Sequence, residues 1–571
     1  MITNLLELFG LILIGVAWLV SDHYMPWLCA YNDSVAAAAL LCLLAPTVSR
    51  LHSLKPRAVP AAFWALVAVA CIPWLQWTFG QLAFFDDAML GSVYVLGLAL
   101  AVLCGFEWAR RDGPGSATRM AIVLVTGAAV SAGIALMQGL EVGDLGLWAL
   151  PDARGGRAGA NLAQPNNLAT LLGLGALAVL LLRERGRLGA GSAASVLVLL
   201  LLGAATTQSR AAMLFGPAVL LGWWLVRRRG VPVRTSLATI SLMTAAHWLL
   251  VYSWPFLQKA LGLHDVAGTL AERQGGGERL KAWAMFFDAL SGSPRLGVGW
   301  LQTASAQLSV AERHGPLLDA VYQHAHNVLL ELVLWCGYPL GLLLCAALLY
   351  WFTDRARRVK SVEAVVGLLM VTVLLIHSLL ELPHHYAYFL IPVGWWAGRV
   401  EHDVGAGIER GANWRWLPVG LSLVMVVCLL KDYPAVEESY RRALFETRRI
   451  GPPYAGELVP EAPFLPSLTT TLHWVRTPAV AGMSAQDLAS LESSTKRFPY
   501  PASMVKLAYA WALNGRLPQA VQMFEKIYFI HGLPAYQVAL GELHARVQAG
   551  DTALAALEAG CPTRWAPREA H

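Results

Sequence analysis

The residues best suited to chemistry in this sequence lie at the edges of long apolar segments. His324, His326 and Asn327 come immediately before an apolar run that begins VLLELVLW. Glu331 lies one helical turn inside that run. Ionisable groups at the boundary of a membrane-length segment are costly to keep, and they are functional candidates by default. A histidine in such a place suits a general base that works near neutral pH.

Arginines supply a second kind of chemistry. Arg210 lies in a short polar connection, TQSRAAML, between two apolar runs, and Arg279 begins an amphipathic stretch in a long polar connection. Guanidinium groups bind phosphate and pyrophosphate through fixed paired donors and permanent charge. Arginines and a histidine base, without a metal, suit attack on a sugar whose leaving group is a lipid-linked pyrophosphate.

Two further polar groups flank apolar runs at similar boundaries, one before residue 167 and one around residue 380. His377 and Glu381 of the second group are spaced i, i+4, so we expect them on one helix face. We expect His326, Arg210, Arg279 and Glu381 to be catalytic. The residues expected to bind substrate are Arg157, Asn161, Gln164, Asn166, His324, Asn327, His377 and Tyr386.

Metal and cofactor sites are not expected. The pair His324-x-His326 is by itself a weak metal motif. The eight cysteines show no metal-ligand spacing, and most lie in apolar runs where packing explains them. No outward connection carries an acidic pair with the D-x-D spacing.

The candidate residues must be held in place by the helices that the long apolar runs form. Apolar residues make up 56% of the chain and charged residues 14%, whereas soluble domains carry about 25% charged residues. The composition therefore predicts an all-α polytopic membrane helix bundle with about 13 spans. We place the spans at roughly residues 5–20, 34–48, 60–77, 88–106, 118–138, 167–182, 193–206, 211–226, 236–252, 327–351, 362–380, 387–400 and 415–431. The first run lacks a basic leader and a cleavage site, so we expect it to be retained.

Basic residues concentrate in every second connection between these spans. The basic connections are residues 50–57, 107–119, 183–187, 227–234 and 353–360. The positive-inside rule places them, and the N-terminus, on the cytoplasmic side of the membrane. All candidate residues then fall on the periplasmic side, in or beside the connections 139–166, 207–210, 253–326 and 381–386. In the large connection 253–326, apolar residues at helical spacing from Leu280 to Leu290 predict an amphipathic surface helix.

The composition changes after the last span. We therefore predict a transmembrane domain, residues 1–432, and a small α-helical periplasmic domain, residues 433–571, with a loose likeness to tetratricopeptide units. In the second domain the sequence predicts a helix over 433–450 that begins at a proline and a serine-capped helix over 484–496. It also predicts a helical hairpin, 503–513 and 517–530, that turns at an Asn-Gly pair.

Several of these motifs resemble those of a known superfamily. Arg210-Ala-Ala-Met-Leu214 resembles the R-x3-L element of the O-antigen ligase and polymerase (WaaL/Wzy) superfamily. His326-Asn327, followed after nine residues by Gly337, resembles its H-N-x9-G element. The second small residue, Gly341, comes one place later than in the superfamily, and we expect this shift to loosen helix packing. The C-terminal helical tail is also in keeping with the protein ligases of this superfamily.

Two further segments resemble the pilin-type protein O-oligosaccharyltransferases (PglL-like) within that superfamily. Residues 159–167, GANLAQPNN, are similar to that family's Gln-Pro-Asn-His segment, with Asn167 in place of the histidine. Residues 377–383, HSLLELP, followed by YAYF, are similar to another of its segments.

The resemblance implies a metal-independent glycosyltransferase. Such an enzyme would move a preassembled glycan from undecaprenyl pyrophosphate to serine or threonine hydroxyl groups of a pilin or another periplasmic protein. Arg210 and Arg279 would neutralise the pyrophosphate, and His326 would accept the hydroxyl proton or orient the acceptor. Asn161 and Gln164 would hold the donor. Glu381, paired with His377, would position the second wall of the site.

Other functions remain open at this point. A ligase that transfers O-antigen to lipid A–core, or an O-antigen polymerase, would share the donor and the chemistry and differ in the acceptor. A polytopic transporter would place ionisable residues near mid-bilayer and show internal repeats, neither of which we find in the sequence. A non-catalytic assembly scaffold would rely on the helical tail alone.

Overall fold

The computed structural model describes residues 2–50, 57–143, 146–150, 156–263, 276–316, 320–410, 416–447, 450 and 459–562. Parts of the predicted connections 50–57, 139–166 and 253–326 and of the tail lie outside the described residues. The chain groups into two compact units. The first unit comprises residues 1–71, 93–274 and 347–426, and the second comprises 72–92, 275–346 and 427–571. The division into domains 1–432 and 433–571 stays a prediction.

A helix lies at every predicted span. The helices are α1 (Ile2–Ala17), α2 (Ala30–Arg50), α3 (Ala61–Ala70) with α4 (Ile72–Thr78), α5 (Phe85–Asp112), α6 (Pro114–Gly139), α7 (Pro165–Glu184), α8 (Ala190–Thr207), α9 (Phe215–Arg228), α10 (Leu237–Ala260), α13 (Val328–Arg358), α14 (Val362–Ser378), α15 (Ala387–Asp403) and α16 (Trp416–Thr447). Eight described helical segments are long and apolar enough to cross a membrane, and three shorter helices are also apolar. The chain is thus an all-α, multi-pass membrane protein, while the count of about 13 crossings stays a prediction.

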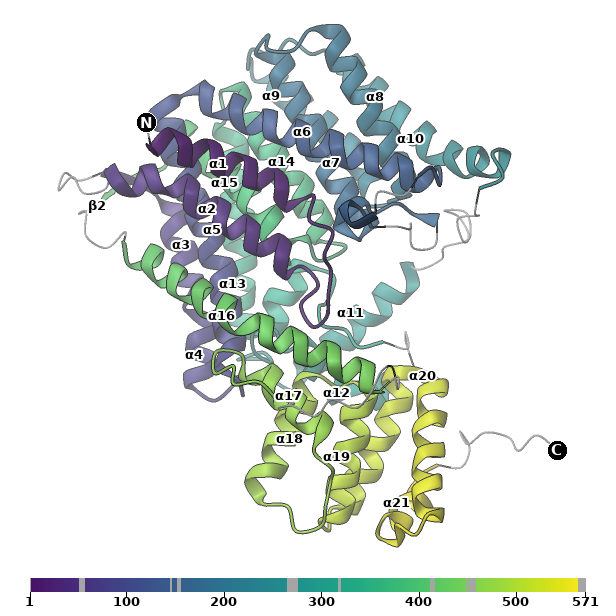
Figure 1. Ribbon diagram of the computed structural model, residues 1–571. Coiled ribbons are helices and arrows are strands. Elements are labelled where there is room, and N and C mark those ends of the chain that lie inside the picture. Colours follow the sequence, from purple (N-terminus) through teal and green to yellow (C-terminus); the bar gives the residue numbers. More distant parts are fainter. Residues whose placement is uncertain are drawn as a thin grey trace. The chain divides into compact units, whose positions relative to one another are not determined.

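The first unit is a helix bundle with an aromatic core. Helices α6, α7 and α8 pack against one another, and α14 packs against α7 and α15 (Figure 1). Trp18, Trp395 and Trp396 are among its fully buried side chains. The indole of Trp18 donates a hydrogen bond to the carbonyl of Tyr388 at 2.9 Å and so joins the end of α1 to α15. A two-stranded antiparallel sheet, β1 (Arg57–Pro60) with β2 (Gly407–Arg410), also belongs to this unit.

The basic connections of the first unit gather at one end of its helices. Four arginine contacts join the helix ends there: Arg185 with Glu363, Arg229 with the carbonyl of Ala356, Arg358 with the carbonyl of Val404, and Arg399 with the carbonyl of Gly113. Asn166, Glu381 and Tyr386 lie at the opposite ends of α7, α14 and α15. The alternation of basic and non-basic connections in the sequence therefore corresponds to the two ends of this bundle.

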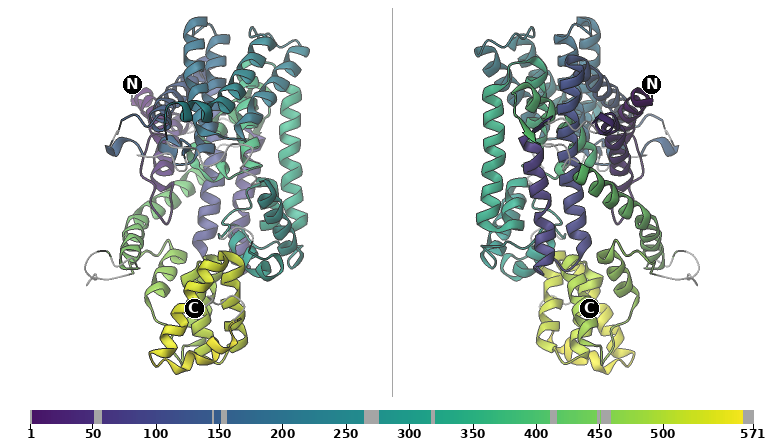
Figure 2. Two further views of the ribbon diagram at one scale, coloured as in Figure 1. Left: turned by 90° about the vertical axis from the view of Figure 1, so that its right-hand side faces the viewer. Right: turned by 90° about the vertical axis from the view of Figure 1, so that its left-hand side faces the viewer.

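The second unit contains the remaining helices. These are α11 (Gly276–Ser291), α12 (Thr303–His314), α17 (Pro466–Arg476), α18 (Ala485–Arg497), α19 (Pro501–Leu513), α20 (Leu517–Gln548) and α21 (Ala555–Gly560). Helices α19 and α20 form the predicted antiparallel hairpin (Figure 2). The predicted serine cap is also confirmed, because the hydroxyl of Ser484 accepts from the backbone N–H of Asp487 at 3.0 Å. Helix α12, which the sequence did not predict, packs against α18 and α20.

The amphipathic helix predicted in the large connection corresponds to α11. Its buried face includes Phe286 and Leu290, whereas Leu280 and Phe287 are exposed. Another prediction was wrong: residues 433–450 do not form a separate helix, because α16 continues through Pro434 to Thr447. A proline inside a helix removes one hydrogen bond, but Val436 beyond it is fully buried, so packing holds the helix together.

Helix α13, in contrast, is broken at Gly337. The backbone there has φ 75° and ψ 171°, and a Cβ at this position would lie 2.4 Å from the carbonyl oxygen of Arg295. The break leaves the carbonyls of Leu334 and Trp335 without partners in the helix. They accept instead from the N–H groups of Val298 and Gly299, at 2.8 and 3.2 Å. The glycine of the H-N-x9-G element is therefore needed both for its backbone angle and for close approach.

Gly341 is also closely packed. A Cβ there would lie 2.5 Å from the Cα of Val333. The expectation that its late position loosens the packing was wrong, because the break at Gly337 brings residue 341 against the preceding turn. Both glycines thus hold the helix that begins directly after the candidate histidines.

Candidate active site

The histidine loop, which we define as residues 320–327, leads into α13 in the second unit. As predicted, His326 and Asn327 lie just before the helix. The side-chain Oδ1 of Asn327 accepts from the N–H groups of Leu329 and Leu330, at 3.1 and 3.2 Å, and so caps the helix. His326 has φ 52°, in the left-handed region. Non-glycine residues rarely adopt this conformation, and those that do cluster at functional sites.

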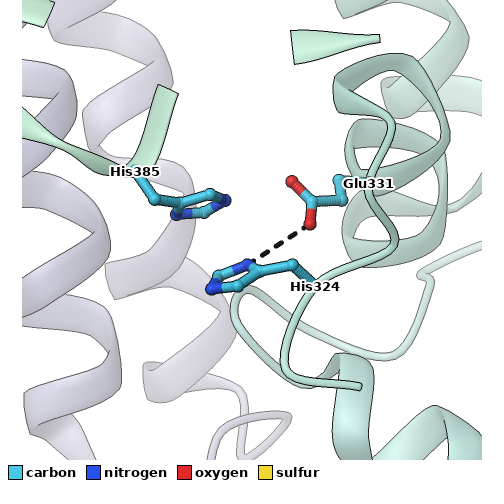
Figure 3. Close-up of side chains that lie close together, drawn as sticks. All are labelled: His324, Glu331 and His385. Carbon is cyan, nitrogen blue, oxygen red and sulfur yellow. Dashed lines mark ion pairs between the residues drawn. The ribbon is translucent and has the colours of Figure 1, made fainter. Parts of the chain in front are cut away.

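Glu331 lies buried beneath the histidine loop. Its side chain is 1% exposed, and Oε1 accepts from the N–H of Ala325 at 2.9 Å. The same oxygen lies 3.3 Å from Nδ1 of His324 (Figure 3). From the other side, the indole of Trp283 in α11 donates to the carbonyl of Ala325 at 3.0 Å. These contacts orient His324 and fix the backbone directly before His326.

Tyr322 brings the two predicted catalytic residues of this unit together. Its ring contacts the ring of His326 edge-on, with centroids 5.9 Å apart. Burial raises the pKa of Tyr322 to about 12, the charge of Glu278 raises it as well, and the charge of Arg279 opposes the shift. Tyr322 therefore keeps its proton at neutral pH and can donate a hydrogen bond. The sequence analysis missed this residue, although it stands two places before His324.

The first unit contains a second polar group, the Asn166 cluster, which comprises Arg157, Asn166, Ser209 and Glu381. The Oδ1 of Asn166 accepts from the hydroxyl of Ser209 at 2.7 Å and from Nη2 of Arg157 at 3.3 Å. Its Nδ2 donates to Oε1 of Glu381 at 3.4 Å. Arg157 also donates through Nε to the carbonyl of Thr207 at 2.9 Å. One asparagine at the start of α7 thus joins the connection before it, the end of α8 and the segment after α14.

Arg210 follows directly after Ser209 of this cluster. Helix α8 ends at Thr207, and Gln208 after it takes the left-handed conformation that turns the chain. The hydroxyl of Ser209 then accepts from the N–H of Ala212 at 3.3 Å. These bonds fix the backbone on both sides of Arg210, whose side chain is exposed. The turn therefore presents a guanidinium group from a defined position.

The structure gives Asn161 and Gln164 local roles. Asn161 is buried, and its Nδ2 donates to the carbonyls of Leu19 and Trp148, at 2.7 and 2.8 Å. The Oε1 of Gln164 accepts from the N–H of Asn167 at 2.7 Å and caps α7. Backbone groups thus contact the side-chain amides of both residues, and the expectation that these residues hold the donor stays a prediction. The contacts support roles in shaping the connection before α7.

His377 and Tyr386 lie near the same end of the first unit. His377 is fully buried, and its Nδ1 lies 2.7 Å from the hydroxyl of Thr170, one turn beyond Asn166 on α7. The pairing of Glu381 with His377 stays a prediction. Tyr386 stacks on Tyr388, with ring centroids 5.1 Å apart.

Two other residues hold Tyr388 and its helix in place. Asn167, which replaces the histidine of the resembling family, is buried and donates to the hydroxyl of Tyr388 at 3.1 Å. The carboxylate of Asp33 in α2 accepts from the N–H of Ala387 at 2.7 Å and so fixes the start of α15. Sequence reasoning missed this role of Asp33, because the backbone groups that it binds at the start of α15 lie more than 350 residues away.

Metal binding depends on the number and kind of ligand atoms that lie close together. In the second unit, His324 and Glu331 offer two suitable ligand atoms 3.3 Å apart. A catalytic zinc ion usually takes three protein ligands and a structural one four. The expectation of a metal-free site stays a prediction.

Comparisons with known proteins now bear on this arrangement. A family model described as "O-Antigen ligase" matches residues 195–345. A second model, described as "Virulence factor membrane-bound polymerase, C-terminal", matches residues 365–546. The chain is 27% identical over 544 residues to the general O-oligosaccharyltransferase of Acinetobacter baylyi, and the alignment covers 92% of each chain. It is 26% identical over 401 residues to the ComP-specific O-oligosaccharyltransferase of the same organism. That alignment covers 70% of this chain and 71% of the relative.

Proposed function

We propose that this chain, which is similar to O-antigen ligases over residues 195–345 and to a general O-oligosaccharyltransferase over 92% of its length, is a glycosyltransferase of protein O-glycosylation. The donor is a preassembled glycan on undecaprenyl pyrophosphate, and the acceptor is a serine or threonine of a pilin or another periplasmic protein. One observation carries the proposal: the similarity to a general O-oligosaccharyltransferase extends over 92% of both chains. It therefore includes both the histidine loop and the Asn166 cluster.

The proposed reaction is a single displacement at the first sugar of the glycan. The acceptor hydroxyl attacks the anomeric carbon, a new carbon–oxygen bond to serine or threonine forms, and the bond to the pyrophosphate breaks. His326 accepts the hydroxyl proton. Undecaprenyl pyrophosphate leaves with an additional negative charge, which Arg210 and Arg279 stabilise. No metal is required by this scheme, because the two arginines supply the positive charge.

The contacts in each unit support these assignments. Tyr322 contacts His326 and is affected by the charge of Arg279, and its protonated hydroxyl can donate to a pyrophosphate oxygen. In the first unit, the Asn166 cluster fixes the turn that carries Arg210, and Glu381 forms part of the wall beside it. His324, Asn327 and His377 would position these groups or the acceptor.

We further propose that both polar groups and residues 433–571 lie on the periplasmic side of the bacterial inner membrane. The support is the gathering of arginines at the other end of the first unit, since lysine and arginine favour cytoplasmic connections. Single cysteines at Arg187 and at Ser21, in a background without native cysteines, test this orientation. A membrane-impermeant maleimide applied to intact spheroplasts should label the residue-21 variant and spare the residue-187 variant, and the reverse pattern would reject the orientation.

A second candidate function is transfer of O-antigen to lipid A–core or to another O-antigen chain. The descriptions of the two family models favour this class. The donor and the displacement would be the same, and only the acceptor would differ. The two named relatives are both O-oligosaccharyltransferases, so we place protein glycosylation first.

The deciding experiment offers both acceptors to one enzyme. Purified protein in detergent is incubated with undecaprenyl-pyrophosphate-linked oligosaccharide and with either pilin or lipid A–core, with and without EDTA. Glycan on pilin in the presence of EDTA is the expected result. Glycan on lipid A–core alone would assign the second candidate function. Transfer to neither acceptor, by folded protein with donor that a known ligase accepts, would contradict both.

A further inference from the structure

Arg497, the last residue of α18, turns its guanidinium group into the interior of the second unit. Its side chain is 11% exposed, and Nε donates to Oδ1 of Asp87, itself 1% exposed, at 2.8 Å. The ring of Phe498 lies against the guanidinium, with its centroid 4.6 Å from Cζ. A nearly buried charge pair is costly unless its geometry and further hydrogen bonds compensate for lost hydration. The surroundings of Arg497 must therefore supply those bonds.

The further bond reaches the histidine loop. Nη1 of Arg497 donates to the side-chain Oε1 of Gln323 at 3.0 Å. Gln323 directly precedes His324 and stands three residues before His326. One guanidinium group thus ties the C-terminal helices both to the first turn of α5, through Asp87, and to the loop that carries the proposed base. The fixed fork of an arginine suits such a two-way contact, whereas a lysine offers a single point charge.

The partners of Arg497 are themselves held in place. The second carboxylate oxygen of Asp87 accepts from Nε2 of Gln302, just before α12, at 3.0 Å. Ser305 in α12 donates through its hydroxyl to the carbonyl of Lys496 at 2.8 Å. Helix α12 and the end of α18 are therefore attached to each other beside the loop.

The loop has a defined attachment at each end. Gln307 in α12 donates to the carbonyl of Ala320 at 3.1 Å and accepts from the N–H of Tyr322 at 2.8 Å. The far end is held by Asn327 and Glu331, as described above. Between these ends, the Gln323 side chain accepts a hydrogen bond from Arg497 and also contacts the hydroxyl of Tyr500, three residues further along the chain. A left-handed residue such as His326 persists only where its surroundings over-determine the backbone.

We propose that Arg497 is a positioning residue for glycan transfer, acting through Gln323 to hold the histidine loop in the conformation that presents His326. This inference rests on the proposed function. It also gives the C-terminal helices a role in the reaction itself, because their contact with the loop is a direct hydrogen bond. If Arg497 only anchored α18, its removal would lower stability and leave the loop and the turnover number unchanged.

The first test measures the loop without using activity. Hydrogen–deuterium exchange is followed for the peptide that covers residues 320–327 in full-length detergent-solubilised protein. Arg497→Gln should speed exchange at the Ala325 amide by about tenfold or more, because a loosened loop opens more often. Lys496→Gln is the matched control. Its side chain is 55% exposed and pairs with Glu492, so exchange should match that of the wild type.

The second test measures steady-state transfer. A loosened loop lowers the populated fraction of the competent state, so kcat should fall by about tenfold or more while the KM for the donor changes by less than about threefold. Arg497→Lys should recover part of kcat. Gln323→Ala removes the loop contact but leaves the buried pair with Asp87, and it should change exchange and kcat in the same direction. The double variant should lose less than the two single variants together, because both changes remove the same hydrogen bond between Arg497 and Gln323.

The outcomes separate the inference from the function on which it rests. Wild-type exchange and wild-type kcat in folded Gln323→Ala protein would overturn the positioning role, even if Arg497→Gln fails to fold. A loss of kcat with unchanged loop exchange in both variants would also overturn it. Wild-type protein that transfers no glycan, while its loop responds to Arg497→Gln, would reject the proposed function and keep the link between Arg497 and the loop.

Discussion

The two polar groups of this protein hold their reactive residues by different means. In the Asn166 cluster, side chains at helix ends bind one another, and the exposed Arg210 follows a turn that they fix. In the histidine loop, the backbone itself is held, and His326 is kept in a conformation that few non-glycine residues adopt. A permanent charge that binds an anion tolerates some freedom, whereas a base must meet one proton in one direction. Substitutions in the two groups should therefore have different kinetic signatures.

His326→Ala should have the largest effect. Removal of a general base costs about 10²–10⁴-fold in rate, and we expect this loss in kcat with little change in the KM for the donor. His544→Ala is the matched control, since that side chain is 57% exposed and pairs with Glu558 in the C-terminal helices. The measurement is initial-rate glycan transfer to pilin. A His326→Ala protein with wild-type stability and full activity would remove the histidine from the mechanism.

Arg210→Ala should come next and should separate the two groups. Loss of one preorganised charge at a developing oxyanion costs about 10²–10³-fold, and here the loss should appear in kcat/KM for the donor. Arg210→Lys should recover part of it, because the charge returns without the paired donors. Arg228→Ala is the control, as that exposed arginine stacks on Trp224 at the opposite end of the bundle. If Arg210→Ala and Arg228→Ala bind and process donor equally well, the proposed pyrophosphate contact is wrong.

The sequence predicted the helices better than the contacts between them. Long apolar runs and capping residues placed the start of α13 within one residue, because both signals are local. The break at Gly337 was not predicted, since it depends on a segment some 40 residues earlier that packs against the helix. Helix α12 was missed because its polar sequence is helical only through packing against the C-terminal helices.

The same distinction applies to the candidate site. Residue type and boundary position were enough to single out His326, Arg210 and Arg279. They were not enough to find Ser209 or Tyr322, whose roles come from partners brought close by folding. For the same reason the sequence did not predict that Gln164 caps α7. Local patterns thus identify which groups can react, and tertiary contacts decide which groups hold them.

Asn166→Ala should have an intermediate effect. The change removes the acceptor of Ser209 and the donor to Glu381, so the turn that carries Arg210 loses a support. A partner left without its hydrogen bond costs about 1–3 kcal/mol of stability if it stays buried. We expect kcat/KM for the donor to fall by about tenfold, in the manner of Arg210→Ala on a smaller scale. Thermal unfolding and donor kinetics on the same preparation measure both, and a loss confined to kcat would contradict the assignment of this cluster to the donor.

Asn167→Ala should have the smallest effect, although it changes the neighbouring asparagine. Asn167 is buried and donates to the hydroxyl of Tyr388, so its loss should cost about 1 kcal/mol of stability. Transfer activity should stay within about threefold of the wild type, because the side chain faces a core tyrosine rather than the cluster. Asn167→His, which restores the residue of the resembling family, should behave similarly if the imidazole still reaches Tyr388. If either variant loses as much transfer activity as is expected of Arg210→Ala, Asn167 would belong to the donor site together with Asn166. The assignment of different roles to the two asparagines would then be wrong.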